Sequence, residues 1–273
     1  SLKTIFRRGK NTILMRYGQV LEQQQGYSPI SKEELEKRPN ARYLGSPQAY
    51  LLKYRYRSGN RLQFGITAEK DAGEQFFKWK NKFGFDFYSI HFYIRNVSVF
   101  KQIAVGDYQL SFGQGLVMNT GFSTQSPQDG ISIYNQASNV KPYSSANEMN
   151  YLRGFATTID CKVLDLTLFY SYKRLDASLI EDTISSKEKF IETIYSTGYH
   201  RTYSEILKKN AIGQHIAGGH LTYRMRVAQI GATAYYTRFS SMFDKNLSQY
   251  NRFTFNSIDN VNASLDYEVI IRK

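Results

Sequence analysis

This 273-residue chain is poor in cysteine, proline and tryptophan, and it contains no long apolar run. The single cysteine, Cys161, excludes an intrachain disulfide and a thiolate metal cage. No stretch approaches the roughly 18 consecutive apolar residues that a membrane-spanning helix requires. The opening residues, Ser1 to Thr4, do not resemble a signal peptide. An exported protein with this sequence is therefore expected to have been trimmed or to be part of a longer chain.

Sequence motifs of covalent chemistry are also missing. There is no Gly-x-Ser-x-Gly elbow, phosphate loop or calcium-binding loop. A serine–lysine spacing at residues 186–189 lies in a polar stretch without the companion motifs of serine–lysine hydrolases. Neighbouring acidic residues, such as Glu33 with Glu34 and Glu181 with Asp182, are typical of solvated loops. We therefore expect no enzymatic activity and no cofactor.

The four histidines give no metal-binding pattern. His215 and His220 are separated by an odd number of positions, which places two side chains of a strand on opposite faces. His91 is on the polar side of its expected strand, and His200 is in a loop. Each is interpreted as a hydrogen-bonded or solvated histidine rather than a ligand, so no metal site is predicted.

The abundant residues are aromatic, and they alternate with polar ones. Aromatic residues make up 15% of the chain, nearly all of them tyrosine (22) and phenylalanine (18). Within 50–57, Tyr54 and Tyr56 share one parity, while Lys53 and Arg55 share the other. Because successive side chains of a strand point to opposite faces, this spacing predicts one aromatic face and one polar face. An aromatic outer face around a polar interior is typical of transmembrane β-barrels.

Eleven strands are expected from this alternation, joined by connections that are long and short in turn. They are predicted near residues 11–20, 50–57, 61–68, 88–95, 99–112, 152–160, 163–172, 216–226, 228–236, 252–256 and 261–269. A capping pattern predicts a short helix after Ser31, and a second pattern at 185–188 would cap another. A further helix is predicted at 202–209. Tight turns at one end and long loops at the other are typical of barrels in an outer membrane.

An odd number of strands leaves the expected sheet with two open edges, which do not persist in lipid. The chain is therefore expected to be part of a larger barrel, or to receive strands from elsewhere.

The chain is strongly basic, with a net charge of +13. Lysine and arginine are spread along it without a dense basic run, which argues against nucleic-acid binding by this segment. Six basic residues beside short turns or on the polar parity are candidates for a lumen-facing ring: Lys53, Arg55, Arg57, Arg61, Arg224 and Arg226. Such a ring could favour anionic solutes, contact anionic partners or headgroups, or simply supply the polar side chains that inward positions need.

Residues 106–116, with the sequence GDYQLSFGQGL, resemble a family of outer-membrane β-barrel proteins of Bacteroidota often labelled helix-hairpin-helix domain-containing. Further matches to that family lie at residues 16–18, 69–74, 144–148, 151–154 and 198–202. The resemblance implies an outer-membrane barrel preceded by small helix-hairpin-helix modules. Those modules are absent from this sequence, so no DNA-related role is carried over.

The most specific part of this resemblance has a structural interpretation. It is expected to let a long strand bend and then leave the sheet, through Gly106, Asp107, Gly113, Gln114 and Gly115. The stretch is not a dinucleotide fingerprint, since Met118 stands where the third glycine would be.

These observations predict that residues 1–273 form a segment of an all-β, antiparallel up-and-down transmembrane β-barrel without a separate soluble domain. The protein is expected in the bacterial outer membrane, in contact with its lipid and with other envelope proteins. It would act as a pore constricted by the loops 113–150 and 173–214, or as a plugged scaffold in a surface or secretion complex. The alternative is a soluble all-β binding or adhesion module.

Overall fold

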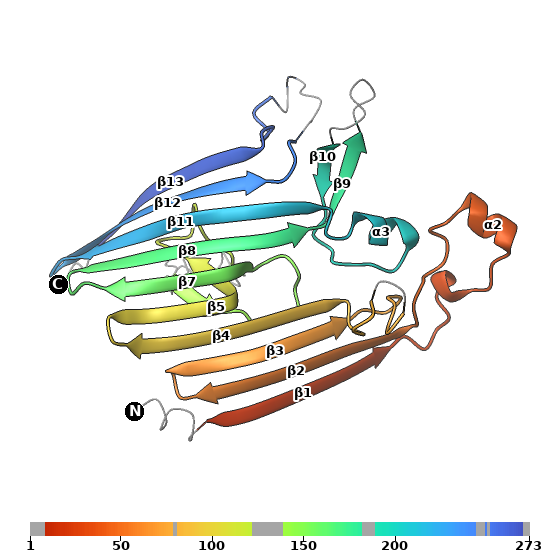
Figure 1. Ribbon diagram of the computed structural model, residues 1–273, viewed down its shortest axis with the longest axis horizontal. Helices are drawn as coiled ribbons and strands as arrows, with labels where there is room; N and C mark the ends of the chain where they lie inside the picture. The colour runs from red at the N-terminus through yellow and green to blue at the C-terminus, as the bar shows by residue number, and fades with distance from the viewer. Residues whose placement is uncertain are drawn as a thin grey trace.

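The chain folds into one antiparallel sheet of eleven strands, accompanied by a two-stranded hairpin and short helices (Figure 1). The computed structural model describes residues 9–78, 81–121, 139–181, 189–243, 249 and 252–269. The strands pair in chain order, and the short β6 (Asn139–Pro142) pairs beside β5. The others are β1 (Lys10–Gln19), β2 (Gln48–Ser58), β3 (Leu62–Lys70), β4 (Phe87–Val97), β5 (Phe100–Ser111), β7 (Leu152–Asp160), β8 (Leu164–Leu175), β11 (Ile212–Arg224), β12 (Ala228–Phe239) and β13 (Asp259–Val269).

The remaining elements lie in the long connections: β9 (Ala177–Glu181), β10 (Lys189–Ile194), the 3-10 helix η1 (Gln25–Tyr27), α2 (Lys32–Lys37) and α3 (Tyr203–Lys208). The two helices confirm the predictions after Ser31 and at 202–209. The Ser31 side chain accepts a hydrogen bond from the Glu34 amide, and Thr202 with Glu205 forms a capping box before α3. The cap predicted at 185–188 lies outside the described residues, but the helix expected to follow it is wrong, because residues 189–194 form β10 and pair with β9. No described helix is long and apolar enough to span a membrane.

The connections divide the sheet into two ends. Tight turns join β2 to β3, β4 to β5, β7 to β8 and β11 to β12 at one end, on the left in Figure 1, which we call the turn end. The long connections, with both helices and the β9–β10 hairpin, lie at the other end, which we call the loop end. The predicted alternation of long and short connections is therefore confirmed.

One predicted strand needs correction. No strand covers 252–256. Phe255 packs against Phe239 and Phe243 in an aromatic cluster at the loop end, so the alternating phenylalanines there imitate a strand without a pairing partner. The described sheet is open at both edges, as the sequence predicts, because β1 and β13 do not pair with each other; it does not close into a barrel. The all-β antiparallel class itself is confirmed.

The sheet is curved, because β2 and β13 line the same cavity although they lie near opposite edges. Side chains on its convex face are apolar and exposed to solvent; Ile90 is 60% and Leu265 83% exposed. Similar residues occur on nearly every strand: Ile13, Met15, Tyr17, Ile66, Phe92, Val105, Phe155, Leu168, Leu221, Tyr223, Ile230, Val261, Tyr267 and Val269.

The concave face has the opposite character, because it buries polar side chains. They include Gln63, Thr67, Ser89, His91, Gln102, Thr158, Asp165, Thr167, Ser171, Lys173, His220, Thr222, Thr233 and Thr237. A water-soluble sheet normally hides its apolar side and exposes its polar side. This sheet reverses that arrangement.

Part of the β5–β7 connection folds onto the concave face; we call its described residues, 112–121 and 139–151, the inward connection. Met118 and Val140 join the buried cluster formed by Tyr93, Tyr108 and Phe169 of the sheet. A connection that is buried against the concave face of a sheet must find hydrogen-bond partners for its backbone N–H and C=O groups there. β6 does so by pairing with β5, and the amide of Thr120 donates to the carbonyl of Leu110 at 2.9 Å.

Gly106 sits in β5 with a φ of +90°, where a Cβ would lie 2.2 Å from the carbonyl oxygen of Ile90. We expect Gly106→Ala to destabilise the fold by about 3 kcal/mol, through backbone strain and displacement of β4. Gly59→Ala is the matched control, because Gly59 has a φ of +52° but no atom within 4 Å of its virtual Cβ. It should cost about 1 kcal/mol. Urea unfolding of both variants tests this, and equal losses would contradict it.

Candidate functional site

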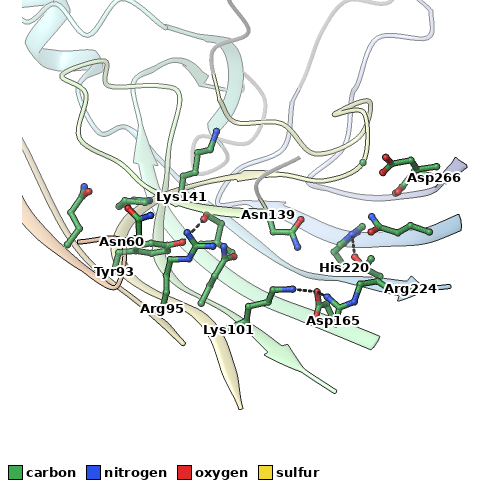
Figure 2. A pocket seen from close by; sticks show the side chains of 18 of the residues that line it. Asn60, Tyr93, Arg95, Lys101, Asn139, Lys141, Asp165, His220, Arg224 and Asp266 are labelled. Carbon is green, nitrogen blue, oxygen red and sulfur yellow. Dashed lines mark hydrogen bonds and ion pairs between the residues drawn. The ribbon is translucent and has the colours of Figure 1, made fainter. Parts of the chain in front are cut away.

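A cavity of about 790 Å³ lies on the concave face near the turn end (Figure 2). Its walls come from β2, β3, β4, β5, β8, β11, β12 and β13, and the inward connection contributes Gly113, Gln114, Ser144 and residues 139–142. Five basic and three acidic side chains line it, which leaves a net charge of +2. We treat it as the candidate site, because it is the larger of the two charged cavities described and the inward connection closes over it.

A row of polar side chains runs across the concave face, and its members Gln102 and His220 line the cavity. Strand register places Gln102 beside Thr158, Thr158 beside Thr167, Thr167 beside His220 and His220 beside Thr233. The hydroxyls of Thr158 and Thr167 are 2.9 Å apart, and His220 Nδ1 is 2.8 Å from the Thr233 hydroxyl. These hydrogen bonds satisfy buried polar groups and hold the His220 side chain beside the cavity.

One carboxylate organises the cations on one side of the cavity. Asp165 is 4% exposed, and its Oδ2 accepts from Lys101 Nζ at 2.7 Å and from Arg224 Nη1. Arg224 Nη2 also lies 3.3 Å from Asp160 Oδ1. Lys101 and Arg224 are therefore held in place and largely neutralised.

Arg95 and Lys141 line the same cavity without an ion pair among the described residues. The Arg95 Nε is buried and has no hydrogen-bond partner there. The Tyr93 hydroxyl donates to the carbonyl of Val140 at 3.3 Å, which anchors the segment carrying Lys141 beside β4. In Figure 2, Arg95 and Lys141 lie with Tyr93 on one side of the cavity, and Asp266 lies on the other.

The six predicted basic residues do not form one ring. Arg57 and Arg224 line the cavity, and Arg57 donates to Gln63 Oε1 from Nε and Nη2. Lys53 and Arg55 follow on the concave side of β2, where Lys53 Nζ donates to the carbonyl of Ser144 at 3.1 Å.

Arg61 and Arg226 are exposed on turns and do not line the cavity. Arg61 donates instead to the carbonyl of Asn96 at 3.1 Å.

Three basic residues of the cavity escaped the sequence analysis. Arg95 lies on the polar side of the alternation in β4, so the sequence pattern could have identified it as a concave-face residue. Lys101 is on the apolar parity, but a register shift between Phe100 and Gln102 turns it toward Asp165. Lys141 lies in a connection, and only the folding of that connection onto the sheet brings it to the site.

The residues of the resemblance motif have separate positions. Gly106 bends β5, whereas Asp107 accepts from Arg153 Nε at 2.7 Å near the loop end. Gly113 lies against Asp266 and, together with Gln114, lines the cavity. Gly115 has a φ of +80°, as expected where the chain leaves a strand.

The inward connection is tied to the sheet at widely separated strands. The ring of Phe112 stacks on His220 of β11, with 4.4 Å between ring centroids. The hydroxyl of Tyr235 in β12 donates to the carbonyl of Val117 at 3.1 Å. Lys173 of β8 donates to the carbonyl of Met149 at 3.1 Å. These anchors, with those of Lys53 and Tyr93, hold the connection across most of the concave face.

A second cluster, centred on His200, joins the loops at the loop end. His200 is 2% exposed; its Nδ1 is 2.5 Å from Asp86 Oδ2, and its Nε2 is 2.7 Å from Asp176 Oδ2. Its backbone amide donates to Glu74 Oε1 at 3.0 Å, and Lys209 Nζ lies 2.6 Å from Asp86 Oδ1. We call this arrangement the His200 clamp. It connects the β3–β4, β8–β9 and β10–β11 connections.

The protonation states of the clamp follow from these contacts. Burial by itself disfavours a charged imidazole, but the hydrogen bonds to Asp176 and Asp86 outweigh it and raise the pKa of His200 to about 10. Although burial opposes it, the contacts with His200 and Lys209 lower the pKa of Asp86. Burial raises the pKa of nearby Glu148 to about 8. His200 is therefore a buried cation at neutral pH.

Two sets of side chains at the clamp have metal-ligand chemistry: Glu74, Asp86 and His200, and Glu148, Asp176 and His200. Tetrahedral bonds of about 2.1 Å to zinc would place ligand atoms roughly 3.4 Å apart. Both imidazole nitrogens are closer than that to a carboxylate oxygen. The arrangement therefore fits a protonated histidine hydrogen-bonded to two carboxylates. His200 lies in a loop, as the sequence predicted, but its position between two carboxylates was not predicted.

Comparison with protein-family models, curated proteins and solved structures finds no match to this chain.

Proposed function

We propose that this protein is an integral outer-membrane protein and that its sheet forms an arc of a closed β-barrel. The observation that carries the proposal is the reversed polarity of the two faces, apolar and exposed outside, polar and buried inside. Lipid accepts apolar side chains on the outside of a barrel, while the interior can be polar. The resemblance to the Bacteroidota barrel family agrees with this proposal.

The two edges of the sheet support the same proposal. Within the described residues, β1 and β13 have no strand on their outer sides. Unpaired backbone groups are very costly in a bilayer, so both edges must be covered there. We propose that further strands complete the barrel.

Of the roles compatible with a barrel, the geometry best supports a plugged scaffold or binding protein with no covalent chemistry. The inward connection occupies the concave face, and the His200 clamp fixes the loop end. Such a rigid loop end can present a prearranged surface to another envelope protein, because little conformational entropy is lost on binding.

Cell fractionation tests the membrane assignment directly. We expect the full protein to sediment with outer membranes, to resist a carbonate wash, and to require detergent for extraction. A protein that stays soluble and monodisperse without detergent would instead be the soluble all-β module.

Planar-bilayer recording separates the scaffold from the pore. We expect no stable conductance from the wild-type protein. Weakening the plug with Phe112→Ala and Tyr235→Phe should produce transient openings, since removal of a buried phenylalanine alone costs about 3–5 kcal/mol. The matched control is Phe155→Ala with Tyr236→Phe on the convex face, which should stay silent. Large, steady wild-type conductance would favour the pore.

A further inference from the structure

The cavity at the turn end contains more positive charge than an inward-facing polar wall requires. An inward wall needs polar side chains, but it does not need unpaired charge. Arg95 and Lys141 line the cavity without a carboxylate partner among the described residues, while Lys101 and Arg224 already share Asp165. Positive charge is thus in excess on the side of the cavity formed by β2, β4 and the inward connection.

We propose that this side of the cavity binds a small water-soluble oxyanion of the phosphate type. Arg95 and Lys141 would supply the charge, and Arg57 would supply a further guanidinium donor. Arginine presents several donors in a fixed plane that matches phosphate oxygens, and lysine adds a mobile point charge.

The acidic residues are placed so that they do not oppose such a ligand. Asp165 is occupied by two cations, and Asp266 is on the opposite side of the cavity from Arg95 (Figure 2). The third lining carboxylate, Glu268, follows Asp266 on β13. The buried Nε of Arg95 has no partner in the described part of the chain. A bound oxyanion would satisfy excess charge that solvent otherwise has to screen.

The location of the site favours a soluble ligand over a lipid headgroup. The cavity opens on the concave face, whereas the apolar side chains that would contact lipid are on the convex face. The size of the cavity, about 790 Å³, is that of a typical small-molecule site. This inference concerns the cavity alone and does not depend on the plugged-scaffold proposal, because binding can be measured in detergent or in buffer.

Isothermal titration of the full protein with inorganic phosphate at low ionic strength tests the proposal. We expect saturable binding with one phosphate per chain. The double variant Arg95→Gln with Lys141→Gln should weaken phosphate binding about 10- to 100-fold, since each charge-assisted hydrogen bond contributes about tenfold in affinity. The matched control is Arg61→Gln with Arg226→Gln, which removes two cations outside the cavity and should leave binding within about twofold.

A gain-of-binding variant makes the test independent of misfolding. Asp165→Asn removes the carboxylate that neutralises Lys101 and Arg224, so phosphate should bind several-fold more tightly. The proposal is overturned if phosphate does not saturate, or if the control pair weakens binding as much as the cavity pair. It is also overturned if phosphorus NMR finds only lipid phosphate at the site and free phosphate does not compete.

Discussion

His200→Ala is expected to release the loop end while leaving the sheet intact. The substitution removes the buried His200 cation from between Asp86 and Asp176, so both carboxylates lose their hydrogen-bond donor from the imidazole. Breaking a buried ion pair in this way costs about 3–5 kcal/mol. Local opening should therefore become easier, and amide exchange in the β3–β4 and β10–β11 connections should accelerate by about 10²- to 10³-fold. Hydrogen exchange followed by mass spectrometry measures this effect.

The matched control is His215→Ala. His215 is exposed on the convex face, and its Nδ1 is 2.9 Å from the Tyr170 hydroxyl. Loss of one exposed hydrogen bond should change exchange only slightly. If both variants behave alike, His200 does not hold the loops.

The clamp also predicts how the loop end responds to pH. The folded-state pKa of His200, about 10, lies above the ordinary value of about 6.5. Its stabilising contribution is therefore complete below about pH 6.5 and is lost as the pH rises through 10. Ionisation of buried Glu148, with a pKa of about 8, acts in the same direction. Exchange at the loop end should accelerate from pH 7 to 11 in the wild type, beyond its intrinsic pH dependence, and much less in His200→Ala.

Ile90→Arg is expected to block assembly of the protein into the membrane. Ile90 of β4 pairs with Ile66 in the middle of β3; it is on the convex face and is 60% exposed. An arginine at the bilayer midplane on the lipid face of a barrel costs about 2–4 kcal/mol. The variant should accumulate outside the outer membrane or unfold at lower urea concentration in lipid vesicles. In a soluble protein the same change would be harmless, because it replaces an exposed apolar side chain with a charge.

A control for position uses the same strand. Asn96→Arg places the same charge at the exposed turn beside β5, where water or headgroups can solvate it. It should assemble normally, apart from a small cost for the positive φ of 55° at that residue. If Ile90→Arg assembles as well as Asn96→Arg, the convex face does not contact lipid.

Much of the fold could be read from local patterns. Strand β2 was predicted from the alternation around Tyr54 and Lys53, and the turn at Asn96 from the break between two such patterns. The alternation depends only on neighbouring residues, so it can be recognised in the sequence without knowing what the strand packs against. The same locality explains the error at Phe253 and Phe255, because alternation alone does not supply a pairing partner.

The candidate site was predicted only in part. Arg57 and Arg224 were found because they lie on regular strands whose parity gives their direction. Lys101 was missed because a register shift reverses its direction, and Lys141 because its connection folds back onto the sheet. Neither the register shift nor the folding back of the connection can be predicted from the residues next to Lys101 or Lys141.

The sequence by itself determined where the main strands run, which of their faces is apolar, and which connections are long. These properties depend on residues a few positions apart, so composition and spacing are enough to fix them. Only the tertiary structure decided that the inward connection packs on the concave face and that His200 joins Asp86, 114 positions away, to Asp176. Those contacts depend on how distant segments meet when the sheet curves, and no local pattern records that geometry.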